Sequence, residues 1–170
     1  IYVPGVSLTQ RNRNTDNIYL GYSSPKTPSR VYLYNLSNKS KKLIKEQKIP
    51  SGHNPDNYIV ERVEFRSHDG RLVPLTITRH KKTIINGSAN LLLYGYGSYG
   101  NSMSPSFSST RLSLIDRDII WATAHIRGGM EKGMKWWKEG KLTNKKNTFE
   151  DYIYAAKYLI DNKYSSKKKI

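Results

Sequence analysis

The sequence predicts an α/β fold for residues 57–170, preceded by short antiparallel strands in residues 1–56. Two apolar segments, 91–94 and 119–126, each run into glycines, a pattern typical of buried parallel strands whose following loops bind ligands. Apolar residues also recur at helical spacing between 149 and 161. The order hairpin, strand, helix, strand, helix is the plan of an α/β domain.

The first part of the chain alternates polar and apolar residues, the period of half-buried strands. We expect three such strands, at 17–25, 29–36 and 42–48. Short antiparallel strands at this spacing suit a propeller blade or the edge of a sandwich. The breaker-rich segment 49–56 is a plausible domain boundary.

The second part should open with a β-hairpin, followed by short helices between the apolar strands. The hairpin strands are expected at 59–66 and 71–78, and the short helices at 111–117 and 134–138. Thr148 and Asp151 resemble a capping box at the start of helix 149–161. In the pair Trp136 and Trp137, one ring is expected in the core and the other at an interface.

Charge is the most unusual feature of the composition. The 170 residues hold 29 Lys+Arg against 13 Asp+Glu, a formal net charge of +16. The lysines are scattered and form no arginine-rich or aromatic-basic motif, which favours a solvated surface over nucleic-acid binding. Cysteine is absent and the histidines lack metal-ligand spacing, so we expect no metal and no cofactor.

No apolar run reaches the roughly 18 residues of a membrane span, and no signal peptide opens the chain. We therefore expect a cytoplasmic protein without a membrane partner. The chain begins at Ile1 without a methionine and ends in Lys167–Ile170, which looks like the opening of a strand. This favours a piece of a longer chain.

Three motifs match known functional patterns, but the residues around each motif argue against that function. Gly95-x-Gly97-x-x-Gly100 fits a dinucleotide fingerprint, but a proline-containing, non-helical segment follows it. Ser98 sits between these glycines without the first glycine or the helix of a nucleophile elbow. Ser67-His68-Asp69 holds the residue types of a catalytic triad in a row. Neighbours in a hairpin turn cannot relay a proton along that line, so we expect a turn there.

The loops that leave the two apolar strands carry the strongest candidates for a site. Tyr96 and Tyr99 lie within the first glycine turn, where a phenol can donate to a developing oxyanion or wall a pocket. Arg127 follows the second strand, and its role is left open between ligand binding and support of a glycine turn. His125, at the end of that strand, is expected to be a satisfied core histidine.

The strings Tyr94-Gly-Tyr-Gly-Ser-Tyr-Gly100, Arg111–Arg117, Ala124–Gly129 and Gly140–Phe149 together resemble the prolyl oligopeptidase family of serine peptidases, its oligopeptidase B branch most closely. The resemblance implies the end of a β-propeller in residues 1–56. It implies the start of an α/β-hydrolase peptidase domain in residues 57–170, without the nucleophile elbow. The catalytic Ser, Asp and His are then absent from this chain.

The resemblance also implies site residues and substrates. Tyr96 matches the tyrosine that completes the oxyanion hole, and Tyr99 matches an aromatic position that lines the substrate pocket. Ser104 and Ser106 stand where bacterial oligopeptidase B carries acidic residues, which weakens a preference for paired basic residues. Met130 replaces a third glycine after Arg127. The implied activity is hydrolysis of short peptides, with cleavage after basic residues as a candidate preference.

Two other classes of protein stay open at this point. One is a non-catalytic, lysine-rich binding module or degenerate homologue, which the absence of a nucleophile elbow beyond Ile170 would support. The other is a dinucleotide-binding protein, which a nicotinamide-binding titration would reveal.

Overall fold

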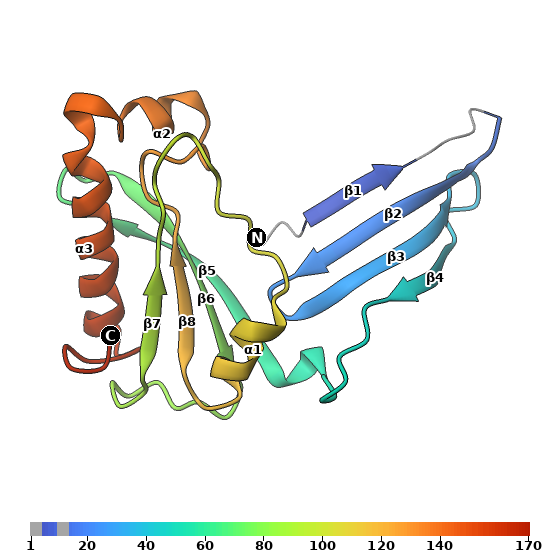
Figure 1. Cartoon of the computed structure of the whole chain (residues 1–170), viewed down its shortest axis with the longest axis horizontal. Helices are drawn as coiled ribbons and strands as arrows, with labels where there is room; N and C mark the ends of the chain where they lie inside the picture. Colours follow the sequence, from blue (N-terminus) through green and yellow to red (C-terminus); the bar gives the residue numbers. More distant parts are fainter. Residues whose placement is uncertain (1–4, 10–13) are drawn as a thin grey trace.

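Two separate four-stranded sheets make up the protein in the computed structural model, which describes residues 5–9 and 14–170 (Figure 1). The first sheet is an antiparallel meander in the order β1-β2-β3-β4, and it projects away from the rest of the molecule. Its strands are β1 (Gly5–Thr9), β2 (Asn17–Ser24), β3 (Thr27–Asn35) and β4 (Lys41–Glu46).

The second sheet begins after a short 3₁₀ helix, η1 (Pro55–Asn57), and has the order β5-β6-β8-β7. Strands β5, β6 and β8 pair antiparallel, whereas β7 pairs parallel with β8. The parallel pair confirms the prediction from the two apolar segments. The strands are β5 (Tyr58–Arg66), β6 (Leu72–His80), β7 (Leu91–Tyr94) and β8 (Ile120–Ala124).

Helices pack on both faces of this second sheet, as an α/β fold requires. Leu159 of α3 joins a large core with residues of β6 and β8, and Leu112 of α1 joins a smaller core with Tyr58 and Ile115 on the other face. The helical elements are α1 (Ser109–Ile115), α2 (Met134–Lys138), η2 (Leu142–Asn144) and α3 (Lys146–Asp161).

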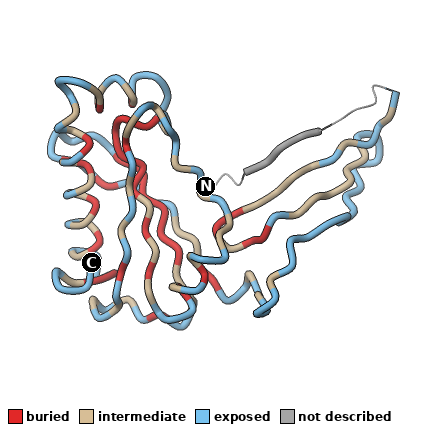
Figure 2. The backbone as a smooth tube through the Cα atoms, viewed as in Figure 1, coloured by how far each residue is buried: buried red, intermediate tan, exposed pale blue. Residues whose placement is uncertain are grey.

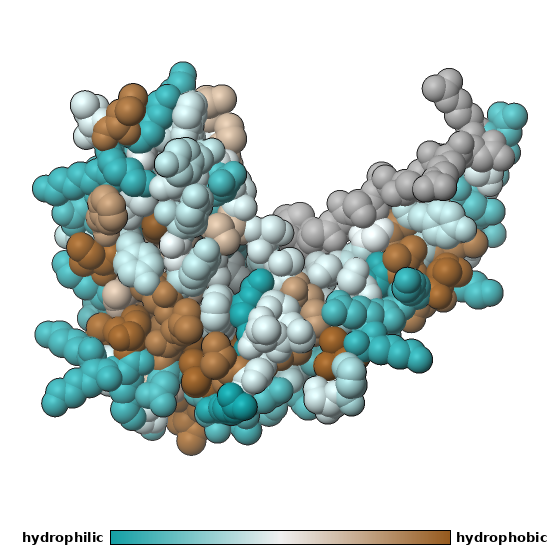
Figure 3. Space-filling model, viewed as in Figure 1, coloured by the Kyte–Doolittle hydropathy of each residue, from teal (hydrophilic) through white to brown (hydrophobic). Residues whose placement is uncertain are grey.

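Burial differs sharply between the two sheets. Apart from Pro25 and Pro28, the buried apolar side chains of the described residues all lie at or after Tyr58, and Figure 2 shows buried residues concentrated in the second sheet and α3. Hydrophobic side chains also reach the surface over the lower part of this sheet (Figure 3). The first sheet therefore contributes little to the core, and β4 is exposed along its length.

Most local expectations were met, but residues 167–169 form a turn and not the expected start of a strand. Helix α2 has its expected bounds, and Trp136 is buried in the core while Trp137 lines a pocket. Helix α3, however, begins at Lys146, and the predicted capping box is wrong. Thr148 and Asp151 lie inside the helix, where tertiary contacts with Arg127 take their side chains. In the described part of the chain, no helix has the length and apolar character needed to cross a bilayer.

Candidate functional site

A sharply turned loop, residues 95–100, leaves the carboxyl end of β7 and is called the glycine loop below. Its backbone is left-handed at Gly97 (φ 60°), Tyr99 (φ 54°) and Gly100 (φ 69°). Left-handed backbone costs a non-glycine residue roughly 1–2 kcal/mol, so Tyr99 is held there by its surroundings. The loop thus presents Tyr96 and Tyr99 at the edge of the sheet where ligands bind in α/β folds.

The turn after β8 supports the glycine loop from behind. Gly100 N–H donates to the Gly128 carbonyl at 3.0 Å. Gly128 has a φ of 97°, and a β-carbon there would overlap the Gly97 carbonyl. A β-carbon on Gly97 would in turn lie 2.7 Å from the Arg127 carbonyl oxygen. The two backbones approach this closely only because neither residue has a side chain.

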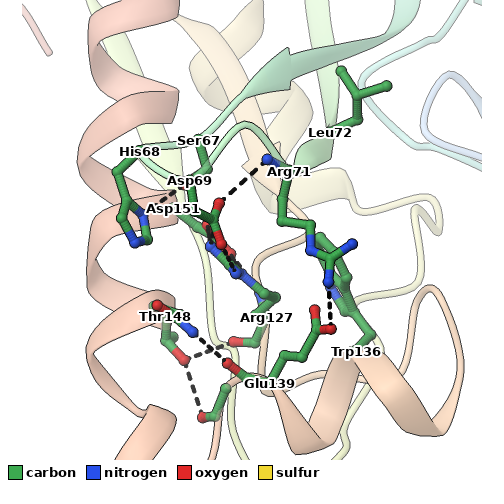
Figure 4. Close-up of polar contacts among 12 residues, drawn as sticks. Ser67, His68, Asp69, Arg71, Leu72, Arg127, Trp136, Glu139, Thr148 and Asp151 are labelled. Carbon is green, nitrogen blue, oxygen red and sulfur yellow. Dashed lines mark hydrogen bonds and ion pairs between the residues drawn. The ribbon is translucent and has the colours of Figure 1, made fainter.

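Arg127 is the centre of a buried ion cluster beneath that turn (Figure 4). Its side chain is 1% exposed and makes a two-pronged contact with Asp151, from Nε at 2.9 Å and from Nη2 at 2.7 Å. Asp151 also accepts the Arg127 backbone N–H at 3.0 Å and the Ser67 hydroxyl. Asp69 accepts one hydrogen bond from Nη1 and one from Nη2, the latter at 3.2 Å to Oδ1.

Hydrogen bonding favours the charged forms of Arg127 and Asp69 in this cluster. Burial alone would lower the pKa of Arg127, but its hydrogen bonds to Asp151 and Asp69 outweigh burial and raise it. Burial would likewise raise the pKa of Asp69, yet the hydrogen bonds from Arg127 hold it below its usual value. Because its guanidinium is enclosed by these carboxylates, Arg127 fits the supporting role that the sequence left open. The triad-like string 67–69 forms a turn, and its Ser67 and Asp69 side chains bind Asp151 and Arg127.

The two tyrosines of the glycine loop are open to solvent. Tyr96 is 42% exposed and Tyr99 is 86% exposed. Within the described part of the chain, the Tyr96 hydroxyl has no hydrogen-bond partner, so its donor is available to a ligand. The structure therefore displays both predicted site tyrosines, with their phenol groups uncommitted.

A pocket of about 470 Å³ lies beside the glycine loop. Its walls come from the glycine loop, from α2 and from the segment that joins α2 to α3. The lining includes two lysines and no carboxylate, and it consists of Ser98, Tyr99, Trp137, Gly140, Lys141, Leu142 and Lys145. The pocket thus combines an apolar wall with cationic groups, a combination found in ligand sites.

Ser104 and Ser106 lie in the exposed segment 101–108 that connects the glycine loop to α1. Ser106 N–H donates to the Ser104 carbonyl at 2.9 Å. The segment is anchored at Met103, whose N–H donates to Glu131 at 2.8 Å, and at Phe107, whose N–H donates to Ser23 of β2 at 3.3 Å. Both serines are thus on a surface segment that links the two sheets.

This connecting segment also removes two alternatives based on motifs. A dinucleotide fingerprint and a nucleophile elbow each need a helix directly after the glycine turn. Here residues 101–108 are irregular and α1 begins only at Ser109. His125 is buried as expected, with Nε2 2.8 Å from the Thr76 hydroxyl. It is only partly satisfied, because its Nδ1 has no hydrogen-bond partner among the described residues and lies 3.8 Å from Glu131 Oε1. Residues 5–9 and 14–170 contain no cluster of three metal-ligating side chains.

Sequence reasoning missed the contacts that hold the loops together. Asp69 and Arg127 are 58 residues apart, and Lys145 bonds Gly97 across 48 residues. No pattern of neighbouring residues in the sequence predicts contacts between such distant residues. The only signal was indirect: polar side chains at the buried face of a helix, Thr148 and Asp151, require polar partners.

Comparisons with known proteins define the class. Residues 105–170 match the model of the prolyl oligopeptidase family. The chain is 41% identical over 170 residues to dipeptidyl aminopeptidase BI of Pseudoxanthomonas mexicana, covering 99% of this chain and 23% of that protein. It is 36% identical over 163 residues to Protease 2 of Moraxella lacunata, covering 96% of this chain and 24% of that protein.

Solved structures agree with this assignment. Oligopeptidase B from Leishmania major superposes with a TM-score of 0.82 at 36% identity, over 92% of this chain and 22% of that one. Prolyl oligopeptidase B from Galerina marginata superposes with a TM-score of 0.90 at 32% identity, over 99% of this chain and 24% of that one.

These matches confirm the resemblance to the prolyl oligopeptidase family that was found in the sequence. It is similar both to proteins named oligopeptidase B and to proteins named prolyl oligopeptidase. The chain spans about a quarter of the length of the relatives that it matches.

Proposed function

We propose that this chain is part of a serine oligopeptidase in which the glycine loop supplies the oxyanion donor Tyr96. One observation carries the proposal: the loop leaves the third strand of the second sheet, β7, and leads to that domain's first helix, α1. In α/β-hydrolases, the loop between the third strand and the first helix contributes a donor to the oxyanion hole. The uncommitted, exposed hydroxyl of Tyr96 fits this role.

The chemistry follows from the position of the donor. A serine attacks the peptide carbonyl with a histidine as base, and negative charge develops on the carbonyl oxygen. A phenol hydroxyl that meets this oxygen only as the charge grows lowers the barrier without tightening substrate binding. The nucleophile, the base and the catalytic Asp are expected outside this chain. A rigidly supported glycine loop keeps the donor in place before the reaction begins.

Substrate contacts are assigned to the surroundings of the loop. Tyr99 walls the pocket beside it, and Ser104 and Ser106 follow on the exposed segment between the two sheets. Because the pocket lining carries lysines and no carboxylate, this pocket does not favour a basic side chain. Arg127 acts on the substrate only through the turn that it supports. We propose short peptides as substrates, a cytoplasmic location, and a β-propeller to which the first sheet belongs.

The test is kinetic and uses the longer protein that contains this segment. Tyr96→Phe should lower kcat on a small amide substrate by about 10²-fold or more, with little change in KM. The control is Tyr94→Phe, since Tyr94 lies two residues earlier in β7 and stacks on Trp121. A kcat/KM for Tyr96→Phe within about twofold of wild type would refute the oxyanion role. Failure of the wild-type protein to hydrolyse peptides would favour the binding-module alternative.

A further inference from the structure

The ammonium group of Lys145 is bound to the glycine loop. Its Nζ lies 2.6 Å from the Gly97 carbonyl oxygen and 2.7 Å from the Ser98 hydroxyl oxygen. Across residues 5–9 and 14–170, Lys145 forms no ion pair with a carboxylate. Both acceptors are therefore neutral groups of one loop.

Lys145 holds the loop from a rigid base. It lies between η2 and α3, and its backbone N–H donates to the Leu142 carbonyl at 3.0 Å. Thr148, in the first turn of α3, donates its hydroxyl to the Arg127 carbonyl at 2.7 Å. Asp151, one turn later, binds the Arg127 guanidinium. The side chain of Lys145 therefore couples the loop to a helix that is itself fixed to the turn after β8.

The environment of Lys145 also opposes a charge there. Partial burial lowers its pKa from the usual value for lysine. The Nζ of Lys145 lies 5.8 Å from the Phe149 ring centroid, whereas the neighbouring Lys141 places its Nζ 3.6 Å from the Trp137 ring centroid, where the aromatic face stabilises a cation more strongly. A half-buried cation without a counter-charge is retained only where its hydrogen bonds compensate for lost hydration. For Lys145 those bonds all go to the glycine loop and restrain its left-handed backbone.

We propose that Lys145 is a positioning residue that fixes Tyr96 for oxyanion binding, an inference that rests on the function proposed above. Tyr96 is joined by one peptide bond to Gly97, and Lys145 donates a hydrogen bond to the Gly97 carbonyl. Holding that carbonyl fixes the plane of the next peptide group and hence the direction from which the Tyr96 side chain leaves the turn. An oxyanion donor is effective only when preorganised. Loss of the hydrogen bond from Lys145 to Gly97 therefore reduces transition-state stabilisation and leaves ground-state binding of the substrate nearly intact.

The experiment measures kcat and KM on a small amide substrate in the longer protein. Lys145→Met, which keeps the length of the side chain and removes the donor, should lower kcat by about tenfold or more with KM within about threefold. Lys145→Arg should recover most of kcat, because it can still donate to both acceptors. The matched control is Lys146→Met, an exposed lysine one position further along, which should behave as wild type.

A double-mutant cycle with Tyr96→Phe tests whether Lys145 acts through Tyr96. If it does, Lys145→Met should cost no more than about threefold in the Tyr96→Phe background, against about tenfold in wild type. Equal, additive losses in the two backgrounds would overturn the proposal. So would a rise in KM at unchanged kcat, or a wild-type kcat in Lys145→Met. If Lys145→Met does not fold, Lys145→Gln is judged by the same criteria.

The cycle also separates the two hypotheses. A Tyr96→Phe variant with near-wild-type kcat/KM refutes the oxyanion role of Tyr96, and with it the positioning role. An impaired Tyr96→Phe beside an unimpaired Lys145→Met refutes the positioning role alone.

Discussion

The buried carboxylate of Asp151 should be the most sensitive single position in this segment. Asp151 is fully buried and accepts hydrogen bonds from the Arg127 backbone, from two guanidinium nitrogens and from Ser67. Asp151→Asn keeps its size but removes its charge and leaves a guanidinium with 1% exposure facing only Asp69. Removing one partner of a buried ion pair costs about 3–5 kcal/mol.

The assay is hydrogen exchange measured by mass spectrometry on peptides that cover residues 124–129. A loss of 3–5 kcal/mol should speed exchange of these amides by roughly 10²- to 10³-fold, since about 1.4 kcal/mol corresponds to tenfold. The matched control is Glu139→Gln, which removes the carboxylate partner of Arg71. In this ion pair the Arg71 side chain is 48% exposed and the Glu139 side chain is 22% exposed. Exposed pairs contribute at most about 1 kcal/mol. Equal exchange rates in Asp151→Asn and Glu139→Gln would refute the reasoning.

Three further outcomes are expected. Gly128→Ala should reduce kcat, as seen in substrate hydrolysis, because its β-carbon would overlap the Gly97 carbonyl in a left-handed turn; normal activity would contradict that overlap. Asp69 has a lowered folded pKa, so its stabilising effect is present above its unfolded pKa and is lost as pH falls through the folded pKa. Acid denaturation of Asp69→Asn should therefore depend less steeply on pH than that of wild type. Tyr99→Ala should raise KM more than it lowers kcat in peptide hydrolysis, because Tyr99 walls a pocket.

The sheet and most helices could be predicted because their signals are local. The apolar segments 91–94 and 119–126 identified β7 and β8 and their parallel pairing. Helix α2 and the tyrosines of the glycine loop were also found from short windows of sequence. What could not be predicted are the partners across the fold, such as Asp69 for Arg127 and Gly97 for Lys145, because sequence spacing says nothing about which loops meet.

The error at the start of α3 has the same origin. A Thr followed three residues later by an acidic residue matches a local capping rule, and Thr148 with Asp151 satisfied it. Tertiary hydrogen bonds to Arg127 outweighed the local preference, and the helix begins earlier, at Lys146. Polar residues on the buried face of a helix therefore indicate a tertiary hydrogen-bond partner elsewhere in the chain more than they indicate a helix cap.

The contact between the glycine loop and the turn after β8 has a consequence for protein engineering. Gly97, Gly128 and Gly140 stack backbone against backbone, and a β-carbon on any of them would collide with a neighbouring main chain or side chain. A mutant library aimed at new substrates should leave these three codons fixed. The library should vary Tyr99 and Leu142, which are 86% and 82% exposed and line the same pocket. The pocket lining then changes, while the glycine contacts that position Tyr96 are kept.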